Sequence, residues 1–124
     1  VGIAENLNLG GKFMLNDPVD LTLAAGIITP TKTFHTLVAQ TDTHPNDNLS
    51  AITAGTTGQI LYLQATPGDV ITVKGNQAPG SGVKILTNGG ADRVLTGDNH
   101  SVIQLIYDGT YWAEVSYSSG QTPS

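Results

Sequence analysis

The hydrophobic positions of this chain come in short runs, and Gly or Pro interrupts almost every one of them. Within the runs, apolar residues alternate with polar ones or form brief stretches of Val, Ile and Leu, which is typical of β-strands. Because Gly and Pro both disfavour helix interiors, this spacing predicts no long helix. The pattern predicts strands at residues 19–23, 33–38, 59–64, 69–74, 83–86, 102–107 and 112–116, with a short strand or one helical turn at 49–52.

The clearest single signal is a β-hairpin near the end of the sequence. The apolar run 102–106 leads into Asp-Gly at 108–109, and the chain returns with Tyr111 and Trp112. Asp-Gly between two such runs is a strong hairpin signal, because the tight turn requires positive φ. Residues 66–69, Thr-Pro-Gly-Asp, predict a type II turn that joins two further strands as a second hairpin.

Regular turns between short β-branched runs predict an all-β fold, an antiparallel β-sandwich of the jelly-roll kind. We expect an extended N-terminal arm or linker at residues 1–18, the β-sandwich at 19–117 and a flexible tail at 118–124. A first edge strand of the same domain is an equal interpretation of 1–18. Strands that are apolar on both faces indicate that a second sheet or another subunit covers them.

Alternation along the strands also predicts which side chains form the core. The facing of Ile60 and Leu61 stays open, because that run is apolar on both sides. The core candidates are Leu21, Leu23, Phe34, Val38, Leu49, Ile52, Ile60, Leu61, Leu63, Ile71, Val73, Ile85, Leu86, Leu95, Ile103, Leu105, Trp112 and Val115.

Composition argues against several classes of partner. Only 12% of the residues are charged, about half the usual share, and ten carboxylates against five basic residues give a net charge of −5. Nucleic acids and anionic membranes both select clustered Lys and Arg, so we expect neither partner. The chain has no cysteine, which excludes disulfides and thiolate metal sites. A surface this poor in charge is expected to be polar and neutral or covered by another subunit.

A series of short motifs covers about three-quarters of the chain in a fixed order. The motifs are AGIITP at 25–30, FH at 34–35, DNL at 47–49 with Ile52, GQILYL at 58–63, ITVK at 71–74, Leu95 and VIQLIYDGTYWAEV at 102–115. Together they resemble a small all-β module of phage and prophage virion surface proteins. The resemblance implies a structural role in capsid decoration or in head or tail fibres, often within a trimer. It implies no enzyme activity and carries over no functional residues.

We therefore expect a phage virion surface component that assembles as a homotrimer and contacts other virion proteins through the N-terminal arm. One alternative is the receptor- or glycan-binding tip domain of a tail fibre, which would contact host surface glycans. A second alternative is an accessory β-domain of a secreted polysaccharide-active enzyme. Loops at 41–48 and 75–82 are expected to lie on the outside.

The sequence offers no strong catalytic, cofactor or metal motif. It has no Gly-x-Ser-x-Gly elbow, no calcium loop of the Asp-x-Asp-x-Asp-Gly type and no marked pair of acids for glycoside hydrolysis. His35 and His44, with Asp42 and Asp47 nearby, fit no standard zinc spacing. We expect no enzyme activity, cofactor or metal. A trimer could nevertheless place His35 or His100 of each copy around an ion on its axis.

Aromatic residues and one histidine remain as candidates for a ligand site or an interface. An exposed Tyr can stack on a sugar or become buried in a subunit contact, whereas Trp112 is expected in the core. Among the tyrosines, Tyr111 and Tyr117 are the better candidates for exposure. The candidate residues are Tyr62, Tyr107, Tyr111, Tyr117 and His35.

Overall fold

The computed structural model describes residues 9–123, and this part of the chain contains strands, two 3₁₀ turns and no α-helix. The all-β prediction is therefore confirmed. The 3₁₀ turns are η1 (Asn88–Gly90) and η2 (Gly97–Asn99). The strands are β1 (Val19–Thr22), β2 (Ile27–Ile28), β3 (Phe34–Val38), β4 (Asn46–Leu49), β5 (Ala51–Ile52), β6 (Ile60–Ala65), β7 (Val70–Val73), β8 (Ile85–Leu86), β9 (Arg93–Thr96), β10 (Val102–Tyr107) and β11 (Trp112–Ser118).

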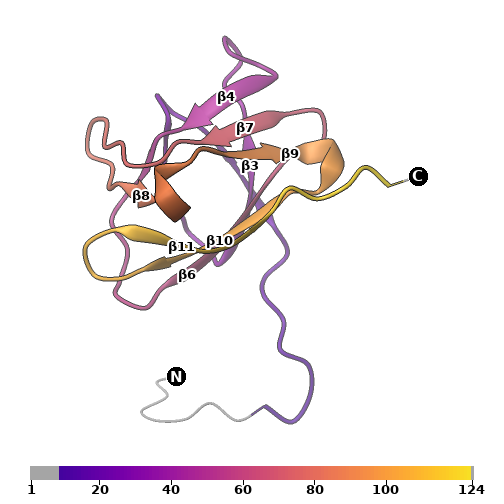
Figure 1. Ribbon diagram of the computed structural model, residues 1–124. Helices are drawn as coiled ribbons and strands as arrows, with labels where there is room; N and C mark the ends of the chain where they lie inside the picture. Colours follow the sequence, from indigo (N-terminus) through magenta and orange to yellow (C-terminus); the bar gives the residue numbers. More distant parts are fainter. Residues whose placement is uncertain (1–8, 124) are drawn as a thin grey trace.

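The strands form three sheets around one core (Figure 1). The largest sheet has the order β1-β3-β6-β10-β11-β8, the second β4-β7-β9 and the third β2-β5. Successive passes of the chain return to the same sheets, because β1, β3 and β6 pair in parallel, as do β4 with β7 and β2 with β5. The passes stack on one another like the coils of a β-solenoid.

Two strands in the last third of the chain, β9 and β10, run in the opposite direction to the strands they join. β9 pairs antiparallel with β7, and β10 pairs antiparallel with β6. The predicted hairpin is confirmed as β10–β11, and the carboxylate of Asp108 in its turn accepts hydrogen bonds from the amides of Thr110 and Tyr111, each at 2.8 Å. The antiparallel part of the fold prediction is wrong, since five of the eight described ladders are parallel.

Parallel pairing needs a crossover between the paired strands, and here the crossover passes through the other sheets. The turn at 66–69 illustrates this route. It closes as predicted, with the amide of Asp69 donating to the carbonyl of Thr66 at 3.0 Å and Gly68 at φ 87°. However, it leads from β6 in the largest sheet to β7 in the second, so the two strands do not form a hairpin.

Most of the predicted core is buried, but five of its candidates lie elsewhere. In β3 the inward residues are His35 and Leu37, so Phe34 and Val38 lie on the opposite face of the sheet. This reverses the predicted facing, because neighbouring side chains of a strand point to opposite sides. The exposed fractions of the other three are 42% for Ile60, 36% for Leu86 and 53% for Val115.

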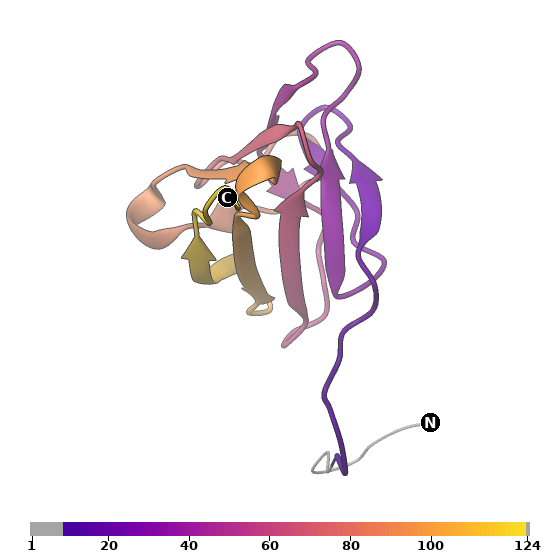
Figure 2. The ribbon, with the colours of Figure 1, turned by 90° about the vertical axis from the view of Figure 1, so that its right-hand side faces the viewer.

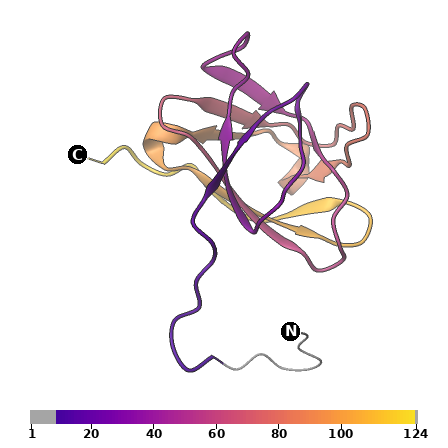
Figure 3. The ribbon, with the colours of Figure 1, turned by 180° about the vertical axis from the view of Figure 1, so that it is seen from behind.

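Residues 9–15 run away from the strands, extended at 12–15 and bent at Gly10 and Gly11, as Figures 2 and 3 show. We call these residues the arm. Residues 1–8 of the arm predicted at 1–18 lie outside the described part of the chain. At the other end, β11 reaches Ser118, and the amide of Gln121 then donates to the carbonyl of Asn99 in η2 at 2.7 Å. The tail predicted at 118–124 therefore begins inside a strand.

Candidate interaction surface

The outward side of the six-stranded sheet is the main candidate for a functional surface. Its central strands β3, β6 and β10 alternate buried residues that face the core with half-buried or exposed residues on the other side. None of these nine outward residues carries a charge, and six are aliphatic or aromatic. We call this set the outer face: Phe34, Thr36, Val38, Ile60, Tyr62, Gln64, Val102, Gln104 and Ile106.

Strand register arranges the outer face in rows. Phe34 is paired with Tyr62, and Ile60 is paired with Ile106 across the neighbouring ladder. Ile106 is in turn paired with Ala113 of β11, which continues the apolar row. Three strands therefore contribute to one uncharged surface that alternation alone could not distinguish from the core.

A groove of about 340 Å³ lies at the end of the outer face where the arm begins. The arm residues Phe13 and Leu15 line the groove together with Ile60 and Tyr62 of β6. Tyr62 therefore belongs to both the groove and the outer face. Among the candidate ligand or interface residues, it is the one that this surface contains.

The other three tyrosines lie in separate places. Tyr107 is 8% exposed and packs edge-on against Trp112, with ring centroids 5.2 Å apart. Trp112 is fully buried, as predicted, and its indole Nε1 donates to the carbonyl of Thr53 at 2.9 Å. Tyr111 is 37% exposed beside the hairpin turn, and Tyr117 is half-buried.

His35 is fully buried, and both of its ring nitrogens are used inside the fold. Nε2 accepts hydrogen bonds from the amides of Thr31 and Lys32 at 3.1 and 3.0 Å. Nδ1 lies 2.9 Å from the carbonyl oxygen of Val19, so the neutral tautomer with its proton on Nδ1 satisfies all three contacts. This geometry does not fit the prediction that His35 binds a ligand, lies at an interface or holds an ion on a trimer axis.

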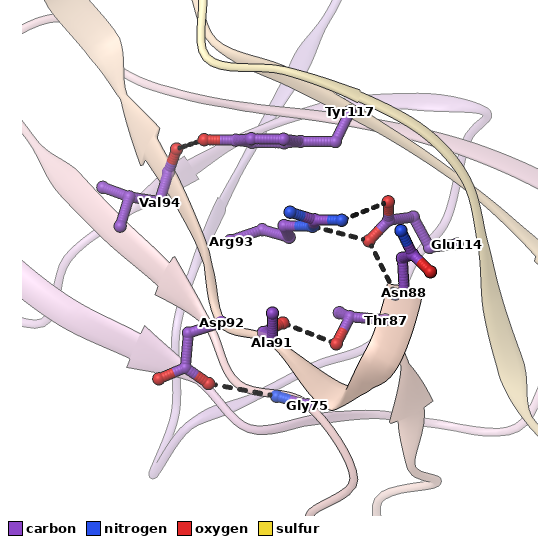
Figure 4. Close-up of polar contacts among 9 residues, drawn as sticks. All are labelled: Gly75, Thr87, Asn88, Ala91, Asp92, Arg93, Val94, Glu114 and Tyr117. Atoms are coloured by element: carbon purple, nitrogen blue, oxygen red, sulfur yellow. Dashed lines mark hydrogen bonds and ion pairs between the residues drawn. The ribbon is translucent and has the colours of Figure 1, made fainter.

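Figure 4 shows a polar cluster that joins β9, β11 and η1. The Arg93 guanidinium meets the Glu114 carboxylate at two points, 2.9 and 3.1 Å apart, and the amide of Asn88 also donates to Glu114 at 3.3 Å. The hydrogen bond to Glu114 raises the pKa of Arg93. Arg93 lies 5.1 Å from the ring centroid of Tyr117, whose hydroxyl donates to the carbonyl of Val94 at 2.6 Å. The cluster is a clamp between two sheets.

A second buried polar group connects the coils. Asp69 is 3% exposed, and its Oδ2 accepts hydrogen bonds from the amide of Ala39 and the hydroxyl of Thr66, each at 3.0 Å. Its Oδ1 lies 2.9 Å from Nδ1 of His44, which is 59% exposed. Asp69 therefore joins the end of β6 to the loop after β3.

Within residues 9–123, no three His, Cys, Asp or Glu side chains gather as a group that could hold a metal ion, so the constellation around His35 and His44 is not assembled. Over the same residues, no helix has the length and apolar character of a membrane span. In comparisons with known proteins, no family model, no curated protein and no solved structure matches the chain.

Proposed function

We propose that this protein is a non-enzymatic structural component of a phage virion surface, in capsid decoration or in a head or tail fibre, and that it assembles as a homotrimer. The observation that carries the proposal is the outer face. Large, contiguous apolar surfaces on soluble proteins mark sites of interaction. The outward side chains of β3, β6 and β10 form an uncharged and mostly apolar surface on which Ile60 is 42% exposed, and contact with sister copies would remove it from water.

The way this chain uses its polar residues supports a structural role. His35, Asp69 and the Arg93–Glu114 pair are engaged in hydrogen bonds within the fold. In this proposal the two larger sheets act as the layers of a sandwich-like body, and stacked coils replace the connections of a jelly roll. The arm is then available for contacts with sister copies or other virion proteins.

A glycan-binding fibre tip is the second candidate function, and Tyr111 is the observation that favours it. Tyr111 is 37% exposed beside the β10–β11 turn, where an aromatic ring can stack on a sugar. Binding to a glycan array that Tyr111→Ala abolishes would support this candidate. An array without signal would leave the structural role as the proposal.

The mass of the purified protein in solution tests self-assembly directly. By light scattering at micromolar concentration we expect about 39 kDa, which corresponds to three chains of 12.9 kDa. Ile60→Lys places a charge in the apolar row of the outer face and should lower this mass to that of one chain. Val94→Lys on β9 is the matched control, because Val94 is also 42% exposed but lies in another sheet.

Two results would overturn the self-assembly proposal. One is a wild-type protein that has the mass of a single chain at micromolar concentration. The other is an equal effect of Ile60→Lys and Val94→Lys on the mass, because the contact surface would then not be the outer face.

A further inference from the structure

We infer that the arm of one copy packs on the outer face of a second copy, with Phe13 and Met14 as its anchoring side chains. The inference rests on the proposed self-assembly and names the segment that completes the contact. Its occupant is a second copy of this chain.

Phe13 and Met14 are the most exposed large hydrophobic residues in the described part of the chain, at 71% and 76%. Neighbouring side chains of an extended segment point to opposite sides, so a single sheet can cover only one of the two. Phe13 lines the groove beside Ile60 and Tyr62 of its own copy yet stays largely exposed. The arm therefore leaves apolar surface that its own copy does not bury.

Asn16 fixes the point at which the arm leaves the body. Its side-chain oxygen accepts hydrogen bonds from the amides of Thr33 and Phe34, each at 3.2 Å, and its amide group donates to the carbonyl of Phe34 at 3.0 Å. Phe34 belongs to the outer face, so the arm starts at the edge of the surface that the proposal places between copies. From there the arm runs away from the sheets (Figure 2).

The extended part of the arm reaches far enough to lie on the outer face of a neighbour. Residues 12–15 are extended and span about 13 Å at about 3.3 Å each, and Gly10 and Gly11 form a bend beyond them. The three strands β3, β6 and β10 and their neighbour β11 lie about 4.8 Å apart, so they span about 14 Å. Phe13 and Met14 can therefore reach a second copy while Asn16 stays in place.

The arm and the outer face also match in chemistry. Lys12 is the one charged residue of the arm, and Asp20 on β1 is an exposed carboxylate at the edge of the same sheet. No atom lies within 4 Å of where a Cβ of Gly10 or Gly11 would be, so this part of the arm can approach another backbone closely. An apolar segment with one cation suits an uncharged face with one acidic edge.

Cysteine cross-linking tests the inference cleanly, because the wild-type chain has no cysteine. A Phe13→Cys chain and an Ile106→Cys chain with a different tag are co-expressed and exposed to a mild oxidant. Each chain carries one thiol, so a disulfide between the two tags can form only between copies. We expect this mixed product, and we expect at least tenfold less of it when Val94→Cys on β9 replaces Ile106→Cys.

The double variant Phe13→Ser, Met14→Ser gives a second readout. It should raise the concentration at which the assembly dissociates by at least tenfold, while its thermal midpoint stays close to that of the wild type. A mixed disulfide no more abundant than the Val94→Cys control, or an unchanged dissociation concentration, would overturn the inference. If Ile60→Lys still abolished assembly in that case, self-assembly would stand and only the role of the arm would fall.

Discussion

Replacing His35 by Phe tests whether a buried histidine organises the start of the coils. The Phe ring is of similar size, so the change removes hydrogen bonds without opening a large cavity. Three backbone groups lose their partner: the amides of Thr31 and Lys32 and the carbonyl of Val19. These groups lie in two different segments before β3, and His35 is the side chain that joins them.

An unsatisfied buried polar group costs about 1–3 kcal/mol. The three hydrogen bonds of His35 are partly buried, so the low end applies, about 1 kcal/mol each and about 3 kcal/mol in total. For a chain of 124 residues this corresponds to a fall of about 12 °C in the thermal midpoint. Such a loss is a large part of the roughly 5–15 kcal/mol that stabilises a typical domain.

Urea unfolding followed by tryptophan fluorescence measures the effect, because the single Trp112 is fully buried in the folded state. His35→Gln is the companion variant, since its amide can both accept and donate hydrogen bonds and should recover part of the loss. A loss below about 1 kcal/mol for His35→Phe would refute the reasoning, as would equal losses for the two variants.

Three further predictions concern other contacts. Hydrogen bonds from the backbone amides of Tyr111 and Thr110 hold the pKa of the Asp108 carboxylate below its ordinary value of 3.8. The stability that these hydrogen bonds provide is therefore present above pH 3.8 and is lost as the pH falls through the lower pKa of the folded state. Asp108→Asn should flatten the dependence of the urea midpoint on acid pH, and an unchanged slope would contradict this. Gly97→Ala should abolish soluble folded protein, because its Cβ would lie 1.9 Å from the carbonyl oxygen of Thr66, whereas Gly10→Ala, with open space around it, should keep the wild-type thermal midpoint. Arg93→Lys keeps the positive charge but loses the two-point contact with the Glu114 carboxylate, so its thermal midpoint should lie between those of the wild type and Arg93→Ala. A thermal midpoint equal to that of the wild type would show that the two-point contact does not contribute to stability.

Local signals made most of the strands and the final hairpin predictable from the sequence, whereas β2, β4 and β9 were not predicted and β4 begins inside the loop expected at 41–48. The Asp-Gly turn and the alternation around it depend on neighbouring residues alone, and β10–β11 forms as expected. The sequence contains no comparable local pattern that indicates parallel pairing between the coils. Alternation is the same in parallel and antiparallel strands, so the Pro67-Gly68 turn looked like a hairpin although it connects two sheets.

The facing of β3 shows why the core prediction failed there. Its two faces carry Phe34, Thr36 and Val38 on one side and His35 and Leu37 on the other. By hydrophobicity the first set is the better core, but in the second set His35 satisfies the amides of Thr31 and Lys32 just before β3 and the carbonyl of Val19 in β1. These contacts are visible only in three dimensions.

Only one residue of the outer face was predicted from the sequence as an interface candidate. Tyr62 was identified as an interface candidate, whereas Ile60 and Ile106 resemble core residues in a sequence that is apolar on both faces of its strands. The Arg93–Glu114 clamp was missed because its two members lie 21 residues apart and share no motif.

Strand β6 has consequences for how the chain is completed during synthesis. On one side it pairs with β3, which precedes it, and on the other with β10, which follows about forty residues later. A nascent chain emerges from the ribosome with its N-terminus first, so β3 and β6 can pair while the other edge of β6 still has no partner strand. Unpaired strand borders recruit other chains, and β6 stays in that state until β10 has been translated.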